Sequence, residues 1–583
     1  MCAAGECSRP PRQCASQPSP LPSANDHGHD QNHRRSVVGC CTPSARQAGH
    51  PALRGRSANR ARRSIPVNAS SPVDGETMSI GQHLTFRGGP NLELDCDYLV
   101  VGSGAGGASA AISLARAGLR VIVAEAGPWR DPEDYPWTML GTMRDMFTDW
   151  GTLVATGESI IPVVQASLVG GTPVINSAIV VRTPGDVLDN WRDEHGLGDS
   201  FTENAIGAAQ DRIERELQIQ QTDWRIAGNV ADFMLRGLNG MGVDTHKITR
   251  NVAGCKGAMQ CLQGCRNRSK QTANMLWMRE LIAEHGGTVL SCAPVSKVTV
   301  AAGHATGAVG RFVEPLSRRC GSRFTVRASR GVVLAASATG TGPLLQRSGV
   351  RLPAIGKYFR GHPGAGVVGV YPHAMDPHTG PSQATASTHH RLDQGIKLES
   401  LSLPLELFAA RVGGSGRVLV DKLADTRNCA MWVTAVRAEA TGHVRQTWWG
   451  GKAVHYVPTQ RDLQRLRFGT KLLAKAHFEM GALKVWPGIA GLPAELGRDD
   501  LACLDTAPLD NRAWTWVLSH LFGGAVLGRS ADTAVVGPDL HVFGVRNLHV
   551  VDAAALPTTL GVNPQHTIMA VAAVTADTLA RRQ

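Results

Sequence analysis

The chain has 583 residues, of which 43% are hydrophobic and 19% are charged, and this balance excludes a fibrous or fully disordered protein. No run of about 18 apolar residues occurs, so the sequence predicts no membrane-spanning helix. The formal net charge is +12, but +5 of it comes from the first 77 residues and no nucleic-acid-binding module is recognised, so the excess does not indicate a nucleic-acid partner.

Residues 1–77 differ in composition from the rest of the chain. They contain ten Arg, nine Pro and five of the 13 Cys, but no Phe, Tyr or Trp. Such a segment cannot bury enough apolar surface to offset its ordering entropy, so we expect a disordered leader. It lacks the apolar core of a secretory signal, and its Arg- and Ser-rich composition fits either an organellar transit peptide or an extension upstream of a true start at Met78.

The body of the chain opens with a strand–helix–strand pattern. Apolar residues over 97–101 predict a strand, Ala-rich residues 108–117 predict a helix, and residues 120–125 predict a second strand. A short glycine-rich turn separates the first strand from the helix. This order is typical of a β-α-β unit that binds a nucleotide.

The glycine-rich turn carries a G-x-G-x-x-G motif at Gly102, Gly104 and Gly107. Gly102 allows a tight turn, Gly104 lets the backbone approach a pyrophosphate, and Gly107 lets the helix pack on the strand. Glu125 ends the second strand, where a carboxylate accepts ribose hydroxyls. The motif therefore predicts a dinucleotide site, but it does not distinguish NAD from FAD.

Three further segments resemble the glucose–methanol–choline (GMC) family of flavin oxidoreductases. Residues 170–178 are similar to a glycine-rich segment of the family, and residues 331–345 are similar to a strand and turn, with Ser337 where the family usually has Gly. The C-terminal blocks 519–528 and 547–568 have the family's order and spacing. The Gly-Val-Asn-Pro motif in the second block most resembles the cholesterol-oxidase and long-chain-alcohol-oxidase branches of the family.

The resemblance implies an α/β fold with FAD as the cofactor. A Rossmann-like FAD-binding domain, assembled from discontinuous segments, is expected over 90–360, with a helical insertion over 191–250. A substrate-binding domain with a mostly antiparallel sheet and flanking helices is expected over 361–505, and residues 506–583 are expected to return to the FAD domain with the catalytic residues. An NAD dehydrogenase is disfavoured, because the C-terminal blocks would have no role in it.

The resemblance also assigns cofactor contacts outside the glycine turn. Gly171 and Asn176 belong to the segment beside the flavin ring. Asp552 and Ala553 fall where related flavoproteins hold the ribityl chain or pyrophosphate, and Val295 falls where the family pairs its backbone with adenine.

His520 and Asn563 are similar to the catalytic pair of the family. Oxidation of an alcohol by a flavin requires removal of the hydroxyl proton and transfer of a hydride to flavin N5, and a neutral imidazole suits the first step. The resemblance implies that His520 is the base and that the Asn563 amide holds the substrate hydroxyl. Asn563 and Pro564 are also typical of a helix cap and first position. His566 is a competing base that helical spacing keeps on a similar side, although the resemblance favours His520.

Cys255, Cys261 and Cys265 form a cluster with two interpretations. A metal or iron–sulfur site usually needs four thiolates and only three are clustered, so we predict no metal and expect structural thiols or one disulfide. The eight Cys of the body are too sparse for a disulfide scaffold. This favours a reducing compartment such as the cytoplasm, unless the leader directs the chain to an organelle.

The middle of the chain predicts the walls of a substrate pocket. Strands are expected over 366–371 and 429–436, and a helix is expected over 461–481. Bulky side chains favour a long-chain or sterol-like alcohol as the small-molecule substrate; they are Leu401, Leu403, Phe408, Trp432, Trp448 and Trp449. The electron acceptor is left open between oxygen and a quinone or cytochrome. The alternative activity is a lyase reaction that keeps the flavin without net redox chemistry.

Overall fold

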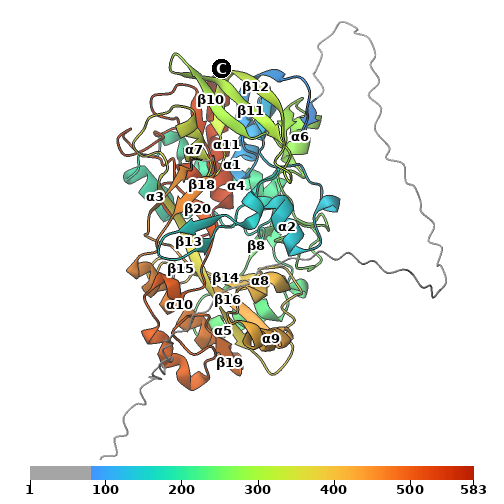
Figure 1. Cartoon of the computed structure of the whole chain (residues 1–583). Coiled ribbons are helices and arrows are strands. Elements are labelled where there is room, and N and C mark those ends of the chain that lie inside the picture. The colour runs from blue at the N-terminus through green and yellow to red at the C-terminus, as the bar shows by residue number, and fades with distance from the viewer. Residues whose placement is uncertain (1–80, 449, 583) are drawn as a thin grey trace, which may run out of the picture. The chain divides into compact units, whose positions relative to one another are not determined.

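A computed structural model describes residues 81–448 and 450–582 (Figure 1). The predictions for the leader, residues 1–77, lie outside these described residues. The described residues belong to one compact unit and form two large sheets with helices packed around them. Within that unit, no helix combines the length and the apolar character needed to cross a bilayer.

The first sheet is built around the predicted strand–helix–strand unit. β2 (Leu92–Val101) and β3 (Val121–Ala124) pair in parallel, and α1 (Ala105–Arg116) connects them. All four residues of β3 are buried, as expected for a strand covered on both faces. The order is β1-β9-β3-β2-β12-β11-β10. The other strands are β1 (Gln82–Leu84), β9 (Thr288–Leu290), β10 (Val295–Ala301), β11 (His304–Val313) and β12 (Cys320–Leu334).

The C-terminal segment returns to this sheet. β21 (Leu548–Val550) pairs in parallel with β12, more than 200 residues earlier in the chain. The predicted α/β fold, Rossmann-like and assembled from discontinuous segments, is therefore confirmed.

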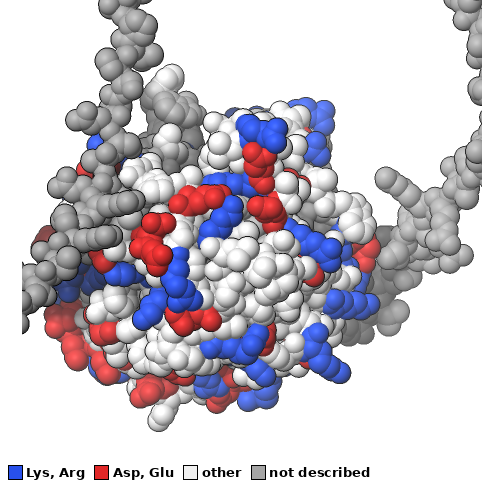
Figure 2. Space-filling model, turned by 90° about the horizontal axis from the view of Figure 1, so that it is seen from below, with Lys and Arg blue, Asp and Glu red and all other residues white. Residues whose placement is uncertain are grey.

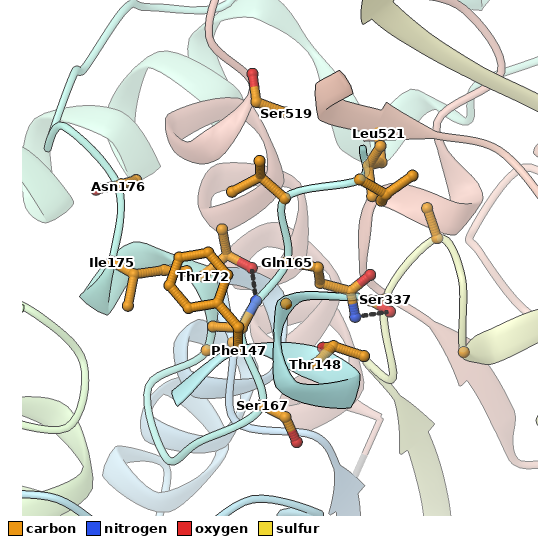
Figure 3. Close-up of a pocket in the computed structure, with 18 of the residues that line it drawn as sticks. Phe147, Thr148, Gln165, Ser167, Thr172, Ile175, Asn176, Ser337, Ser519 and Leu521 are labelled. Carbon is orange, nitrogen blue, oxygen red and sulfur yellow. Dashed lines mark hydrogen bonds between the residues drawn. The ribbon is translucent and has the colours of Figure 1, made fainter. Parts of the chain in front are cut away.

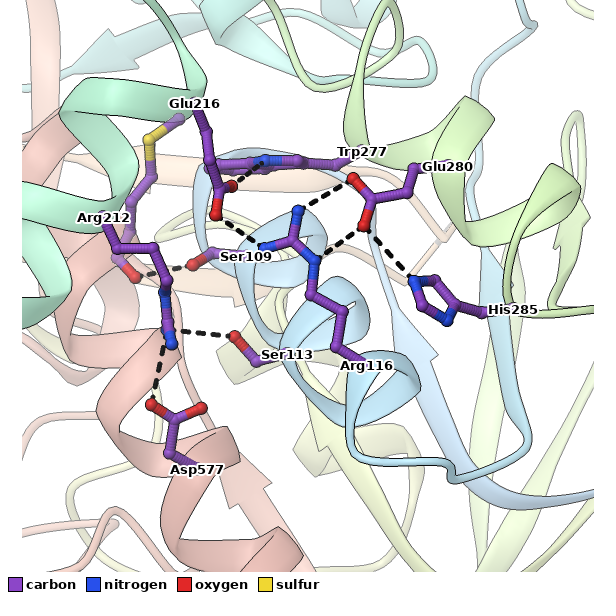
Figure 4. Close-up of polar contacts among 10 residues, drawn as sticks. Ser109, Ser113, Arg116, Arg212, Glu216, Trp277, Glu280, His285 and Asp577 are labelled. Carbon is purple, nitrogen blue, oxygen red and sulfur yellow. Dashed lines mark hydrogen bonds and ion pairs between the residues drawn. The ribbon is translucent and has the colours of Figure 1, made fainter.

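Polar contacts hold together the helices that cover this sheet (Figure 4). Arg116, at the end of α1, forms ion pairs with Glu216 at 2.7 Å and with Glu280 at 2.6 Å. Glu216 ends α4 (Glu203–Glu216), and Glu280 lies in α6 (Trp277–Ala283). Ser109 of α1 donates a hydrogen bond of 2.8 Å to the Met569 carbonyl of α11 (Gln565–Arg581). Three distant segments thus fix the helix that follows the glycine turn.

The second sheet is mostly antiparallel, as predicted for the substrate side. Its order is β5-β4-β18-β17-β13-β16-β15-β14-β7, and β19 and β20 also pair with β13. The predicted strands over 366–371 and 429–436 correspond to β13 (Lys357–Val370) and β16 (Cys429–Val436). The other strands are β4 (Val154–Thr156), β5 (Ile161–Pro162), β7 (His246–Lys247), β14 (Thr385–Ser387), β15 (Ile396–Leu401), β17 (Gly442–Gln446), β18 (Lys452–His455), β19 (Lys484–Trp486) and β20 (Val517–Phe522). The sheet therefore also takes strands from outside 361–505.

The remaining helices cover the edges and faces of the two sheets. The helix predicted over 461–481 is α10 (Gln460–Glu479), which Thr459 and Asp462 open with a capping box. The others are α2 (Met139–Met146), α3 (Gly185–Asp193), α5 (Asn229–Gly240), α7 (Thr341–Arg347), α8 (Leu405–Ala409) and α9 (Gly416–Ala424), and a separate ribbon pairs β6 (Ile219–Gln221) with β8 (Thr249–Asn251).

Figure 2 shows the face that carries the lower elements of Figure 1. Basic and acidic side chains are intermixed there around a region without charge. The excess of basic residues therefore does not gather into a single patch on this face.

Candidate active site

One cavity of about 1000 Å³ is lined by residues of both sheets and of the C-terminal segment. Its size is that of pockets that hold a large cofactor or ligand. Every residue predicted for the site contributes to its wall except Gly107; these residues are Gly102, Gly104, Glu125, Gly171, Asn176, Val295, His520, Asp552, Ala553 and Asn563. Segments that are distant in sequence thus meet around one space.

The glycines of the turn serve two different purposes. A Cβ on Gly102 would lie 2.3 Å from the Ala335 carbonyl oxygen, and one on Gly107 would lie 1.9 Å from the Gly102 oxygen, so both are required for packing inside the protein. A Cβ on Gly104 would meet nothing closer than the Gly171 Cα at 3.9 Å. Gly104 therefore leaves free space toward the cavity, which is the space that an approaching pyrophosphate needs.

Glu125 holds the far side of the same turn. Its carboxylate accepts hydrogen bonds from the Ser103 backbone N–H at 2.9 Å, from the Ser103 hydroxyl at 2.7 Å and from the Gly127 N–H at 2.9 Å. Burial raises the pKa of Glu125, and these hydrogen bonds oppose the rise. Glu125 therefore lines the cavity, and its contact with a ribose stays a prediction.

Asp552 fixes a second turn on the cavity wall. Its carboxylate accepts hydrogen bonds from the Ser337 N–H at 2.7 Å, the Thr341 hydroxyl at 2.6 Å and the Ala554 N–H at 2.7 Å, while burial raises its pKa to about 6. Ser337 has a positive φ of 81°, which explains why a glycine is expected there. Figure 3 shows Gln165 donating to the Ser337 hydroxyl at 3.0 Å, a contact that supports this strained residue.

Asn176 joins the glycine-rich loop to the start of α11. Its Nδ2 donates to Gln565 Oε1 at 2.5 Å, and its Oδ1 accepts from the Ala178 N–H at 2.8 Å. Gln565 in turn donates to Asn251 at 3.3 Å. The loop and the helix terminus are thereby held in a fixed relation along the cavity wall.

The cysteine cluster lies behind this loop. Lys270 donates to the carbonyls of Val174 at 2.8 Å and Asn176 at 2.6 Å, and Arg250 donates to the Ser177 carbonyl at 3.0 Å and to the Cys261 sulfur at 3.1 Å. Burial raises the pKa of Cys261, but Arg250 and Lys270 outweigh it and bring the pKa to about 7. Lys270 and Arg250 therefore support the loop that carries Asn176, and Arg250 also contacts the Cys261 thiol.

A chain of polar contacts runs through His520, with a donor at each end. The Gly561 N–H donates to His362 Nε2 at 3.0 Å, and His362 Nδ1 lies 3.1 Å from His520 Nδ1. His520 Nε2 lies 3.1 Å from Asn563 Nδ2, and the Lys397 ammonium donates to Asn563 Oδ1. The predicted catalytic pair is therefore in direct contact.

The imidazoles of His362 and His520 are both neutral at pH 7. Burial lowers the pKa of His520 to about 4, with Glu399 opposing the decrease and Lys397 adding to it. Burial also lowers the pKa of His362 well below its ordinary value, and the neighbouring His520 adds to the effect.

This series of polar contacts contains one hydrogen-bond donor more than it contains acceptors. Each neutral imidazole and the amide accepts at one end and donates at the other, while Gly561 and Lys397 both donate inward. One inner contact must therefore bring two donors together. An oxygen that only accepts, placed between His520 Nε2 and Asn563 Nδ2, supplies the missing acceptor. An alkoxide or carbonyl oxygen meets this requirement better than an intact hydroxyl, which also donates.

Lys397 and Glu399 form a buried ion pair beside Asn563. Their side chains are only 3% and 6% exposed, and the Lys397 nitrogen lies 2.7 Å from Glu399 Oε1. Since Lys397 also donates to Asn563 Oδ1, the amide is turned so that its NH₂ group faces His520. The pair thus determines the orientation of the predicted catalytic amide.

The sequence did not point to His362, Lys397 or Glu399. Lys397 and Glu399 are two residues apart in β15, so their side chains share one face of a buried strand, and two opposite charges on such a face are a signal for a buried pair. His362 stands in Gly-His-Pro, where no spacing distinguishes it from a packing histidine.

His566 does not share the side of Asn563. α11 begins at Gln565 with Pro564 as its N-cap, so Asn563 lies before the helix and helical spacing does not relate the two residues. The prediction that Asn563 caps the helix is therefore wrong, and so is the prediction that Asn563 and His566 lie on one side of it. The His566 ring is buried toward α4, with Nδ1 3.8 Å from Glu214.

The cavity wall includes a group of apolar side chains that pack in one cluster and are here called the apolar lobe. It consists of Leu262, Leu401, Leu403, Leu407, Met431 and Val433. Of the pocket residues predicted from sequence, Leu401 and Leu403 are confirmed. Phe408 and Trp432 are instead buried in the core, and Trp448 is 93% exposed, because large apolar residues alone do not reveal which surface they cover. Trp449 lies outside the described residues.

The discontinuous, mostly parallel sheet and the glycine turn beside one cavity are the features of a dinucleotide-binding fold. The chain belongs to the GMC oxidoreductase family, whose N- and C-terminal models match residues 97–364 and 449–572. Its cofactor is FAD, and the open cradle at Gly104 fits this group.

Several proteins are similar to the chain over most of its length. It is 31% identical to an uncharacterized GMC-type oxidoreductase, Rv0492c, of Mycobacterium tuberculosis, over 82% of this chain and 75% of that one. It is 24% identical to the long-chain-alcohol oxidase FAO4B of Arabidopsis thaliana, over 93% of this chain and 75% of that one.

Solved structures share the fold. A formate oxidase variant of Aspergillus oryzae aligns with a TM-score of 0.67 at 16% identity, over 84% of this chain and 99% of that one. A pyridoxine 4-oxidase from Mesorbium loti aligns with a TM-score of 0.62 at 17% identity, over 84% of this chain and 99% of that one.

Proposed function

We propose that the chain oxidises an apolar alcohol to an aldehyde or ketone. The observation that carries this proposal is the contact of 3.1 Å between His520 Nε2 and Asn563 Nδ2 in the cavity that also contains the glycine turn. When it is bound, FAD would supply the hydride acceptor; Gly104, Glu125, Val295, Asp552 and Ala553 would hold it, and Gly171 and Asn176 would contact its ring.

His520 and Asn563 handle the hydroxyl group. His520 Nε2 receives the hydroxyl proton, and its new N–H and the Asn563 NH₂ group then both donate to the oxygen that has lost its proton. This arrangement binds the reacting oxygen more strongly than the hydroxyl, which is the condition for catalysis. The Glu399 carboxylate offsets the positive charge that forms on His520, since it raises the pKa of that imidazole.

Two further observations support an apolar alcohol as the substrate. The apolar lobe lines the same cavity as the His520–Asn563 pair and consists of Leu, Met and Val side chains. Several similar proteins are named long-chain-alcohol oxidases, at 23–26% identity.

The test follows the flavin absorbance of the purified holoprotein when alcohols are added without oxygen. We expect a long-chain alcohol to bleach the absorbance, and His520→Gln or Asn563→Ala to retain FAD but react slower by about 10²–10⁴. His566→Gln is the control, because that ring lies away from the cavity, and it should react at the native rate. Readmitting oxygen or adding a quinone then identifies the electron acceptor.

Unchanged flavin absorbance with every alcohol would contradict the proposal. Cleavage of a hydroxynitrile by the same holoprotein, with the flavin remaining oxidised, would then establish the lyase alternative.

A further inference from the structure

We propose that the substrate of this site carries a carboxylate at the far end of its apolar chain, and that Arg411 binds this carboxylate. The inference rests on the proposed oxidation of an apolar alcohol and names its class more closely, as a hydroxy acid. It is carried by the place and the partners of one guanidinium group.

Arg411 lines the cavity beside the apolar lobe. It follows α8, which contributes Leu407 to that lobe, and its backbone N–H is fixed by the Phe408 carbonyl at 2.9 Å. Its Nη1 donates to the Trp516 carbonyl at 2.9 Å. The guanidinium is therefore held at a defined point of the wall and does not move freely in solvent.

The guanidinium has no anionic partner in the described part of the chain. A guanidinium has five N–H donors, and the contact with Trp516 uses only one of its nitrogens. Burial lowers the pKa of Arg411, and no carboxylate opposes the decrease. Glu399, the acidic residue at this end of the cavity, is already paired with Lys397. A half-buried cation without a counter-charge is costly, and an anionic ligand removes that cost.

The position of Arg411 defines where the anion lies relative to the reacting carbon. Trp516, whose carbonyl Arg411 contacts, is four residues before His520, and β20 is extended between them. Four extended residues span at most about 14 Å. Arg411 and His520 are thus tied to two points of one short stretch of backbone, so we expect the alkyl chain between the hydroxyl and the carboxylate to be of no more than medium length. A guanidinium pairs with a carboxylate through two parallel hydrogen bonds, so a carboxylate suits this position.

The experiment compares a hydroxy acid with its methyl ester, which has the same length and no charge. The holoprotein is assayed with a series of ω-hydroxy acids of increasing chain length and with the corresponding esters. We expect kcat/KM for the acid to exceed that for the ester by about tenfold or more at the best length. In Arg411→Gln this preference should disappear, while kcat/KM for the ester stays at the native value.

Two features of the variants separate recognition from folding. Arg411→Gln keeps an N–H donor for the Trp516 carbonyl, and the ester measures the intactness of the site. Arg417→Gln is the matched control, since Arg417 is an exposed residue of α9 paired with Asp421 at 2.7 Å, and it should keep the native preference. Equal use of acid and ester by the native protein would overturn the proposal. An equal loss for both substrates in Arg411→Gln would assign Arg411 a structural role instead.

A binding measurement keeps this inference separate from the oxidation itself. Decanoate has no hydroxyl group to oxidise, and its binding to the holoprotein is measured by isothermal titration calorimetry. We expect Arg411→Gln to weaken decanoate binding about tenfold or more and Arg417→Gln to leave it unchanged. If alcohols are not oxidised but decanoate binds through Arg411, the proposed function fails and the anion site stands. If native protein and Arg411→Gln bind decanoate equally, the anion site fails.

Discussion

Burial sets the proton affinity of His520, and this has a measurable consequence for the rate. Its pKa falls from an ordinary value of 6.5 to about 4, and a base acts only in its unprotonated form, which prevails above the pKa. We therefore expect kcat/KM for an alcohol to remain level as the pH falls through 6.5 and to decline only near pH 4. Initial rates over this range, after brief exposure to acid, provide the measurement. An acidic limb centred near 6.5 would show that His520 is solvated in the working enzyme.

Lys397 is predicted to act through Asn563. In Lys397→Met the amide loses the donor that orients it, and Glu399 becomes an unpaired charge in a buried position. We expect a loss of about 3–5 kcal/mol in the free energy of unfolding, because breaking a buried pair strands its partner, together with a lower kcat. Urea unfolding and steady-state rates measure the two effects.

The double variant Lys397→Met/Glu399→Gln separates these effects. It removes both charges, so most of the stability should return, while kcat should stay low because Asn563 is still free to turn. Recovery of kcat together with stability would mean that the pair only supports folding and does not orient the amide.

The turn after β2 offers a test at the scale of a structural element. Gly107→Ala places a Cβ 1.9 Å from the Gly102 oxygen, so we expect little folded protein. Gly104→Ala meets no atom closer than 3.9 Å, so the chain should fold but bind FAD weakly, since the methyl group occupies the cradle. Gly207→Ala in α4 has open space around it and is the control, with native FAD content. Absorbance measures the bound FAD, and circular dichroism measures how much of each variant is folded. Native FAD content in Gly104→Ala would contradict a pyrophosphate at this turn.

The same scale shows why some elements could be predicted and others could not. The unit from Leu92 to Ala124 follows from local signals, because strand, glycine turn and helix are adjacent in sequence. The return of the C-terminal segment to the first sheet has no local signal and was expected only from the family resemblance, and its pairing through β21 and β12 was not predicted. The Lys397–Asn563 contact joins a strand and a helix entrance 166 residues apart, and no periodicity connects them. Sequence patterns thus identified the groups that carry chemistry, whereas the groups that orient them depend on tertiary contacts.

At the scale of the whole molecule, the cavity depends on segments that lie far apart in the described part of the chain. The glycine turn comes from the first sheet, Lys397 and Glu399 come from the second, and Asn563 comes from the return segment. Packing these elements together buries histidines in both sheets and in α11. The site and the core therefore share one property, the exclusion of water from imidazole rings.

This shared burial predicts how the whole molecule responds to acid. His520, His549 and His566 have pKa values lowered by burial from 6.5 to about 4. The unfolded chain binds protons at these residues below about pH 6.5, whereas the folded chain does not until about pH 4, so the three histidines together lower the free energy of unfolding as the pH falls between these values. Asp552, whose pKa is raised to about 6, acts in the opposite direction over the same range, but it is one group against three. A difference of about 2.5 pKa units amounts to about 3 kcal/mol for each histidine at the acidic end.

We therefore expect Tm to be nearly constant above pH 7 and to fall steeply between pH 6.5 and pH 4, measured by thermal unfolding at closely spaced pH values. His549→Leu tests the assignment, because neither ring nitrogen of His549 has a hydrogen-bond partner in the described part of the chain and the residue lies outside the cavity. This variant should lose less stability on acidification while keeping the native kcat/KM. A Tm that begins to fall only below pH 4, where carboxylates take up protons, would show that the buried histidines do not control acid stability.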